Sequence, residues 1–294
     1  MTAARAVSAL LLAAALCLDG GGAAAGVLDR IAAEGVLRAG TRDHVSPFAA
    51  RDAEGRFRGF SVEMIEAVRD ALAARLGRDI VLDLAEVDAA SRIGAVESGA
   101  LDITCDIASP TWAREARIDF SLSIFFNGTR VLVERDVAAG GLDGLDAARI
   151  GVVAASTTIG VVRAALPAAR IEEFPDMEAA LAALQAGRLD GISNISIILR
   201  DLQRQAAQPG RYVLLPRSGY LNAEPMACIL PEDDSAWRDF VNRTIADLLE
   251  GVEEYRGGYY EAYRRWFGPE AELHYPLSRE AIEHFRQIRI WLDG

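Results

Sequence analysis

The sequence predicts an α/β fold built as two similar halves, and three observations lead to this prediction. Apolar segments of strand length alternate with amphipathic helical segments, a pattern typical of sheets with mainly parallel strands. A second series of the same kind starts near residue 150. Residues 95–103 and 183–192 also resemble one another, because in each a helical segment ends on Gly and a strand opens with Leu-Asp. A repeat array needs at least about three copies, so we expect two lobes.

In the first half, a buried strand is followed by a long amphipathic helix. Ser61 is the expected cap of this helix, and Gly77 its expected end. Its apolar positions recur at helical spacing and share one face; they are Val62, Ile65, Val68, Leu72 and Leu76. Strands are predicted at residues 36–40, at residues 80–84 and from Leu101 onward, and helices after Gly59 and near residues 92–98.

In the second half, the predicted order is a strand at residues 150–153, a turn at 155–158 and a helix at 161–166. Past Pro225 we expect a strand at 226–230, an amphipathic helix at 235–250 and an aromatic-rich helical tail. Residues 136–144 link the halves and are rich in Gly and Asp. This composition favours a hinge or surface connector there, the alternative being an ordinary loop.

The first 25 residues have the composition of a secretory signal peptide. Arg5 precedes an apolar run over residues 6–18, and a Gly- and Ala-rich stretch ends at Ala25. The run is shorter than the roughly 20 apolar residues of a membrane-spanning helix. Lipoprotein processing at Cys17 is disfavoured, because Leu16 stands where a small residue is needed. We therefore expect residues 1–25 to be cleaved off during export to the periplasm.

Charge and cysteine content restrict the possible functions. The net charge of -12 argues against partners that require clustered cations, nucleic acids and anionic lipids among them. It does not exclude a small anionic ligand, since a few arginines can dominate one cleft. Cys105 and Cys228 remain after cleavage, and an even count in an oxidising compartment favours a disulfide over two buried thiols. We expect a monomer without metal or cofactor.

Three motifs give the chain a recognisable likeness. They are residues 59–64 (GFSVEM), residues 109–121 (SPTWAREARIDFS) and residues 128–133 (GTRVLV). Together they resemble solute-binding protein family 3, the polar amino acid binding proteins of ABC importers. Within the family, Arg42, Arg92, the two cysteines and the run that starts at Phe125 are most similar to the glutamate/aspartate-binding group.

The resemblance implies a type II periplasmic-binding-protein fold, with two α/β lobes, two hinge crossings and a cleft between the lobes. Lobe 1 would comprise residues 27–134 plus 226–294, and lobe 2 residues 135–225. Both cysteines then fall in lobe 1, which is compatible with a bridge. The implied partners are a small anionic ligand and the membrane permease of an ABC importer.

The resemblance also implies where a ligand carboxylate binds. Arg114 matches the family arginine that holds the α-carboxylate, and a guanidinium suits this task because its planar fork donates two parallel hydrogen bonds. Ser109 matches a position that contacts the same group. Thr157 and Thr158 open a predicted helix, whose free N–H groups and dipole favour an anion. The alternatives are a solvated arginine and a cap that serves only its own helix.

Side-chain specificity is assigned to Arg42 and Arg92. In relatives that bind basic amino acids the position of Arg42 carries an acid, so a cation there favours an acidic ligand. Arg92 matches an arginine of the acidic-ligand group, and the alternative for both is a surface position. Most relatives hold the ligand ammonium with a carboxylate that here aligns with Ile195. The ligand is therefore an acidic amino acid held through Asn194 or Ser196, or a carboxylate without an amine.

Two other classes of function remain as alternatives. Some relatives of this fold are enzymes, including cyclohexadienyl dehydratases, but the three histidines, His44, His274 and His284, are widely spaced and no nucleophile or phosphate-binding motif is present. We therefore predict a protein without catalytic residues. A membrane-anchored sensor would need a transmembrane helix after residue 270, which the tail does not provide. A soluble ligand sensor is the remaining alternative.

Overall fold

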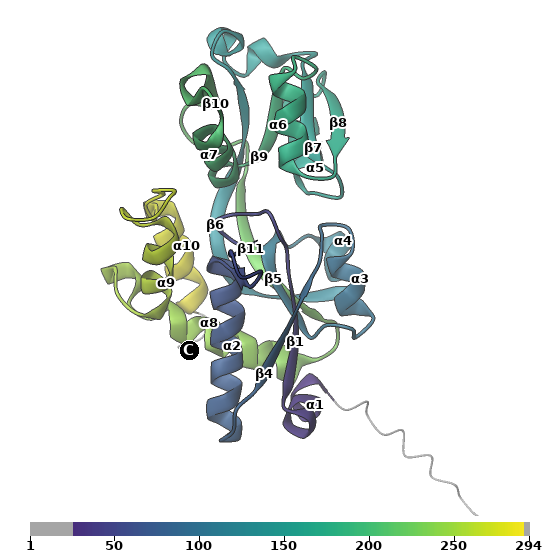
Figure 1. Ribbon diagram of the computed structural model, residues 1–294, viewed down its shortest axis with the longest axis vertical. Coiled ribbons are helices and arrows are strands. Elements are labelled where there is room, and N and C mark those ends of the chain that lie inside the picture. Colours follow the sequence, from purple (N-terminus) through teal and green to yellow (C-terminus); the bar gives the residue numbers. More distant parts are fainter. Residues whose placement is uncertain (1–25, 291–294) are drawn as a thin grey trace, which may run out of the picture.

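The computed structural model describes residues 26–290 and confirms the two-lobed α/β fold (Figure 1). The predicted signal peptide lies outside the described residues. Lobe 1, at the bottom of Figure 1, contains the sheet β4-β1-β5-β11-β6, and lobe 2, at the top, contains β6-β9-β7-β8 with β10 also paired to β6. One long strand therefore belongs to both sheets.

The strands of lobe 1 are β1 (Val36–Thr41), β4 (Val81–Glu86), β5 (Ile103–Ala108), β6 (Ile118–Glu134) and β11 (Ala223–Pro231), beside a small hairpin of β2 (Ala50–Arg51) and β3 (Phe57–Arg58). Those of lobe 2 are β7 (Arg149–Val153), β8 (Arg170–Phe174), β9 (Gly191–Ile195) and β10 (Tyr212–Leu215). Pairs β1·β4, β1·β5, β7·β8 and β7·β9 are parallel, whereas β6 and β11 run antiparallel to their neighbours.

The helices beside the first sheet are α1 (Val27–Glu34), α2 (Phe60–Leu76), α3 (Arg92–Glu97), α4 (Trp112–Glu115), α8 (Ser235–Leu249), α9 (Gly258–Phe267) and α10 (Arg279–Ile290), and those beside the second are α5 (Thr158–Ala165), α6 (Met177–Gln185) and α7 (Ser196–Gln205). Within the described residues, no helix is both long and apolar enough to cross a membrane.

Helix α2 begins two residues earlier than predicted, at Phe60, because the chain must pass close to another backbone segment. Its N-cap is Gly59 at φ 148°, where a Cβ atom would lie 1.9 Å from the carbonyl oxygen of Phe48. Only glycine fits there. Ser61, the predicted cap, is instead buried inside the first turn. The predicted end is confirmed, since Gly77 adopts the left-handed conformation at φ 64°.

The chain crosses between the lobes inside β6. Residues of β6 up to Gly128 pair with β11, and from Thr129 onward they pair with β9. This change in pairing comes before residue 134, the predicted boundary of the lobes. Of the two roles predicted for residues 136–144, the hinge is wrong, because the crossing lies earlier, inside β6. The segment is a surface connector of short 3-10 turns, from which Ala138 is buried in the core of lobe 2. Its Gly and Asp content reflects an ordinary turn.

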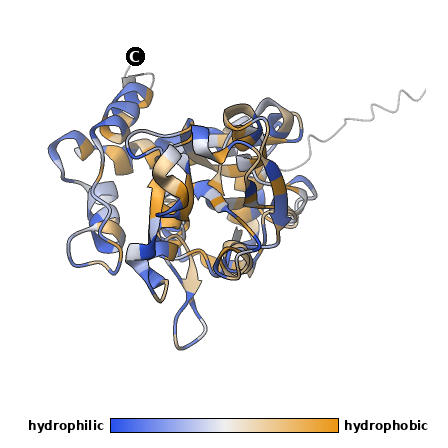
Figure 2. Cartoon of the chain, turned by 90° about the horizontal axis from the view of Figure 1, so that it is seen from above, coloured by the Kyte–Doolittle hydropathy of each residue, from blue (hydrophilic) through white to orange (hydrophobic). Residues whose placement is uncertain are grey.

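The core of lobe 1 is closed by aromatic side chains from both ends of the chain. Phe48, Phe60 and Phe125 pack against Tyr263 and Phe267 of α9, with ring centroids 4.7 to 6.3 Å apart. Hydrophobic colours in Figure 2 accordingly concentrate on the central strands, and hydrophilic colours on the outer loops. Aromatic pairs of this geometry stabilise a core beyond the area they bury, so the tail anchors lobe 1.

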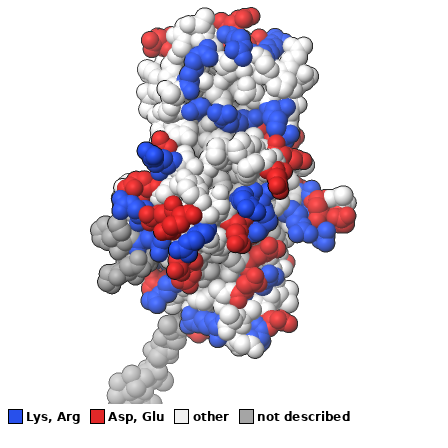
Figure 3. Space-filling model, turned by 90° about the vertical axis from the view of Figure 1, so that its left-hand side faces the viewer, with Lys and Arg blue, Asp and Glu red and all other residues white. Residues whose placement is uncertain are grey.

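Charged side chains on the outside of lobe 1 are mixed in sign. On the face drawn in Figure 3, acidic and basic groups lie interspersed over this lobe. Many of them form exposed ion pairs, such as Arg265 with Glu63 and Arg117 with Glu97. Such pairs contribute little to stability individually. The buried arginines described below differ from them in being removed from water.

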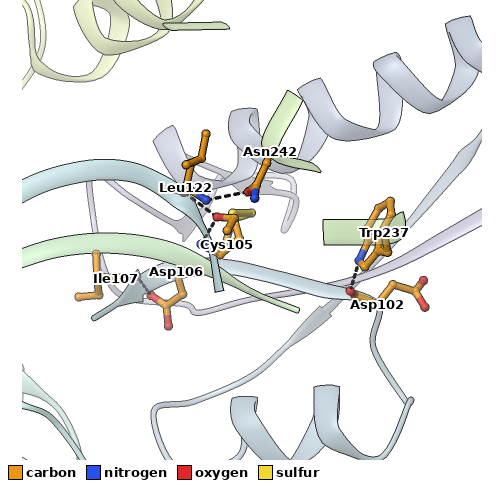
Figure 4. The surroundings of a disulfide bond; sticks show 9 residues. Asp102, Cys105, Asp106, Ile107, Leu122, Trp237 and Asn242 are labelled. Carbon is orange, nitrogen blue, oxygen red and sulfur yellow. Dashed lines mark hydrogen bonds between the residues drawn. A yellow bond between two sulfur atoms is a disulfide. The ribbon is translucent and has the colours of Figure 1, made fainter. Parts of the chain in front are cut away.

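A disulfide joins Cys105 on β5 to Cys228 on β11, as predicted (Figure 4). The two residues face one another across antiparallel strands. Around them, the Cys228 N–H donates to Ser121 Oγ at 2.9 Å, and Trp237 Nε1 of α8 donates to the Asp102 carbonyl at 2.9 Å. The bridge therefore lies in a fully buried, hydrogen-bonded part of lobe 1.

We expect reduction of the bridge to lower the free energy of unfolding by about 2–5 kcal/mol, because the cross-link closes a loop between residues 123 apart. Urea unfolding with and without reductant measures the difference. The double variant C105S/C228S is the control, since its stability should not respond to reductant. A wild-type curve that is identical under both conditions would contradict the expectation.

Candidate ligand-binding site

All seven residues predicted to bind a ligand line the same pocket between the lobes. Lobe 1 contributes Arg42, Arg92, Ser109 and Arg114, and lobe 2 contributes Thr157, Thr158 and Asn194. The remaining lining residues are Ala89, Ile107, Val153, Ser156, Ile195 and Glu224. The sheets explain this convergence, because Arg42 follows β1, Ser109 follows β5 and the Thr157 turn follows β7. Ligands of open α/β sheets bind at these carboxyl ends.

Arg114 connects the two lobes at the edge of the pocket. Its Nη1 donates to the Ser109 carbonyl at 2.8 Å, and its Nη2 donates to the Ala155 carbonyl of lobe 2 at 3.2 Å. Burial, together with the positive charge of Arg92, lowers the pKa of Arg114 to about 10. The guanidinium thus remains charged at neutral pH while it is largely removed from water, and there its attraction for an anion is strong.

Arg92 and Arg42 share one buried carboxylate that sequence reasoning missed. Asp106, at the end of β5, accepts from Arg92 Nη1 at 2.5 Å and lies 3.8 Å from Arg42 Nε. Burial alone would raise the pKa of Asp106, but the charges of Arg92 and Arg42 and the Ile107 N–H outweigh burial and lower it. Asp106 is therefore ionised, and it balances one of the two positive charges.

Arg92 is 3% exposed, and its Nε has no hydrogen-bond partner among the described residues. An unpaired buried donor costs about 1–3 kcal/mol, and a charged one costs more. Natural structures rarely retain such a group without a role. The free donor and the surplus positive charge make this end of the pocket suited to an anion.

The lobe 2 side of the pocket is the N-terminal end of α5. Thr158 is its first residue and is buried, and Thr157 precedes it as the N-cap. The Thr157 hydroxyl donates outward rather than capping the helix, to Glu224 Oε1 at 2.5 Å. Thr157 and Thr158 line the pocket, so the positive end of the helix dipole lies at its lobe 2 side.

Glu224 is the second residue that sequence reasoning missed. It lies on β11 where the chain crosses between the lobes, and its side chain is buried within the pocket lining. Its carboxylate accepts hydrogen bonds from the hydroxyls of Ser109, Thr129 and Thr157. The signal available was an acid directly before Pro225, but the predicted strand began only at residue 226.

The two alternatives for holding an amine from lobe 2 differ in the structure. Asn194 lines the pocket, where its Oδ1 accepts from the Ile195 N–H at 2.7 Å. Its amide NH₂ is a donor, so it suits an oxygen atom of a ligand rather than an ammonium group. Ser196 is buried and does not line the pocket, so its role in holding an amine stays a prediction. Ile195 itself lines the pocket. The position that the family resemblance assigns to an ammonium-binding carboxylate is therefore apolar in this pocket.

Two α/β lobes joined by crossing strands around a polar interlobe pocket define the class of solute-binding proteins. The chain belongs to the bacterial extracellular solute-binding proteins, family 3, whose family model matches residues 37–269. Members of this family bind amino acids, and the fold and the pocket are those of such a protein.

Individual relatives differ in what their names say they bind. The glutamate/aspartate import solute-binding protein of Escherichia coli is 27% identical over 85% of this chain and 84% of its own length. The general L-amino acid-binding periplasmic protein AapJ of Rhizobium johnstonii is 24% identical over 84% and 73%. The crystal structure of the ancestral amino acid-binding protein AncCDT-1, a precursor of cyclohexadienyl dehydratase, superposes with a TM-score of 0.70 at 23% identity, covering 83% of this chain and all of that one.

Replacing Asp106 with Asn should lower the free energy of unfolding by about 3–5 kcal/mol, because Arg92 would remain buried without its counter-charge. Chemical unfolding at neutral pH measures this loss. E97Q is the matched control, since Glu97 pairs with Arg117 at the surface and its removal should change stability little. A D106N protein as stable as wild type would contradict the pairing.

The pH dependence provides a second measurement on the same variant. The folded-state pKa of Asp106 is below its unfolded value, so its ionisation stabilises the fold above that unfolded value, about 4, and this contribution is lost as the pH falls through the folded pKa. The difference in stability between wild type and D106N should therefore shrink on acidification. A difference that stays constant down to low pH would contradict this account.

Proposed function

We propose that the protein is the extracytoplasmic solute-binding component of an ABC importer, and that it captures an acidic amino acid or related dicarboxylate between its lobes. The observation that supports this most is the convergence of three guanidinium groups and a helix N-terminus on one interlobe pocket. Guanidinium groups and helix N-termini both recognise carboxylates. Delivery to a permease and a periplasmic location follow from the family and from the predicted signal peptide.

The pocket offers separate places for two carboxylates. Arg114 and the first turn of α5 lie on opposite lobes and can hold one carboxylate between them, with Arg114 donating from lobe 1. Arg42 and Arg92 are only half balanced by Asp106 and can hold the second. A basic side chain would add positive charge beside two arginines, which costs several kcal/mol at an interface of this kind. Acidic ligands are favoured on this ground.

Binding, rather than catalysis, is the function that the pocket supports. A general acid or base must be free to exchange a proton with the substrate, whereas Asp106 is engaged by arginines and Glu224 by three hydroxyl groups. The named relatives at the sequence level are binding proteins as well. A bound ligand recovered chemically unchanged after prolonged incubation, as followed by NMR, is the expected outcome.

Arg114→Ala should weaken ligand binding by about 2–5 kcal/mol, because a buried ligand carboxylate would lose its charged partner. Calorimetric titration with glutamate and aspartate measures the loss. Arg117→Ala is the matched control, since this arginine is three residues away, exposed and paired with Glu97. Equal affinities for the Arg114 variant and wild type would remove Arg114 from the site.

A ligand held from both lobes should stabilise their closed arrangement. Small-angle scattering with glutamate or aspartate should therefore give a smaller radius of gyration, whereas lysine and neutral amino acids should leave it unchanged. The shift depends on differential affinity for the two arrangements, so a compound that lacks one carboxylate should close the protein poorly. Compaction by lysine but not by glutamate would reverse the proposed specificity.

A further inference from the structure

The direction of the hydrogen bonds around Glu224 determines what this side of the pocket can still accept. An ionised carboxylate only accepts, so the hydroxyls of Ser109, Thr129 and Thr157 must be the donors. Each hydroxyl has a single proton, and in Ser109 and Thr157 that proton is directed to Glu224 Oε1. The hydroxyl oxygens of Ser109 and Thr157 can therefore only accept hydrogen bonds from a ligand.

Ser109, Thr157 and Glu224 therefore form a cluster of acceptors within the pocket lining. A ligand carboxylate is also an acceptor, so it cannot bond to this cluster and would be repelled by the Glu224 charge. An ammonium group has three donors and no acceptor. It matches the cluster both in hydrogen-bonding capacity and in charge.

The cluster also lies at a suitable place relative to Arg114. The Ser109 carbonyl accepts from Arg114, and the Ser109 hydroxyl donates to Glu224. Arg114 and Glu224 thus flank the same residue, although they form no ion pair with each other in the part of the chain that the structure describes. A carboxylate on Arg114 and an ammonium on Glu224 can then be substituents of one carbon atom.

The charges of the pocket favour the same ligand. Arg42, Arg92 and Arg114 are balanced by Asp106 and Glu224 only in part, so one positive charge is left over. A ligand with two carboxylates and one ammonium neutralises it. A dicarboxylate without an amine would leave a buried negative charge, and buried net charge is costly.

We propose that Glu224, with the hydroxyls of Ser109 and Thr157, is the ammonium-binding subsite of this protein and replaces the carboxylate missing at Ile195. The inference deepens the proposed function and rests on it. It narrows the ligand from dicarboxylates in general to α-amino dicarboxylates. It also assigns the Ser109 hydroxyl to the amine rather than to the carboxylate.

The test compares glutamate with glutarate, which has the same two carboxylates and no amine. Calorimetry on the full-length mature protein should give wild type at least about 30-fold tighter binding of glutamate, as expected for a buried charged hydrogen-bonding partner. In Glu224→Gln, glutamate should lose most of this advantage, whereas glutarate should bind as before or more tightly. Glu232→Gln, an exposed carboxylate just beyond β11, controls for the change in net charge.

Each outcome separates the two proposals. Wild-type protein that binds neither acid overturns the proposed function together with the subsite. Wild-type protein that binds glutamate and glutarate equally overturns the subsite alone, and this measurement does not depend on the folding of any variant. Equal weakening of both ligands by Glu224→Gln, in a variant whose thermal unfolding matches wild type, would mean that Glu224 only supports the crossing strands, which also overturns the subsite.

Discussion

Three guanidinium groups lie around one interlobe pocket, and their mutual repulsion is the constraint that the rest of the site satisfies. Like charges removed from water repel strongly, so the fold places Asp106 between Arg42 and Arg92 and brings Glu224 to the side of Arg114. The charges do not cancel, because two carboxylates lie among three guanidinium groups. The remaining positive charge favours an anionic ligand, in line with the proposed function.

Two neighbouring strands of lobe 1 carry the carboxylates Asp106 and Glu224. Asp106 directly follows Cys105 on β5 (Figure 4). Glu224 lies four residues before Cys228 on the neighbouring β11. The disulfide thus links the two strands that carry the counter-charges of the pocket. Strand β6 runs alongside and continues into lobe 2, so the same layer that supports the site also connects the lobes. Stability and site geometry are therefore coupled through the central strands of lobe 1.

Local sequence patterns predicted the elements around the pocket well where the local signal is strong. The helix that ends at Gly77, the strand pattern of β1 and β5 and the turn before α5 follow from periodicity and from glycine conformation. A hinge was only one of the roles expected for residues 136–144, because a Gly- and Asp-rich turn has the same composition as a hinge. The actual crossing lies in a regular strand, and no residue type marks the point at which a strand changes its partner.

The sequence by itself determined the class of fold and the residues whose chemistry is visible in isolation: the arginines, the threonine turn and the cysteine pair. Only the tertiary structure placed Asp106 and Glu224 in the site, because a carboxylate shows its role only through the groups that it contacts. Glu224 is 115 residues from Ser109 and 67 from Thr157 in the chain. Hydrogen bonds over such separations form only when both sheets and both crossings are in place, and so no local pattern could have indicated them.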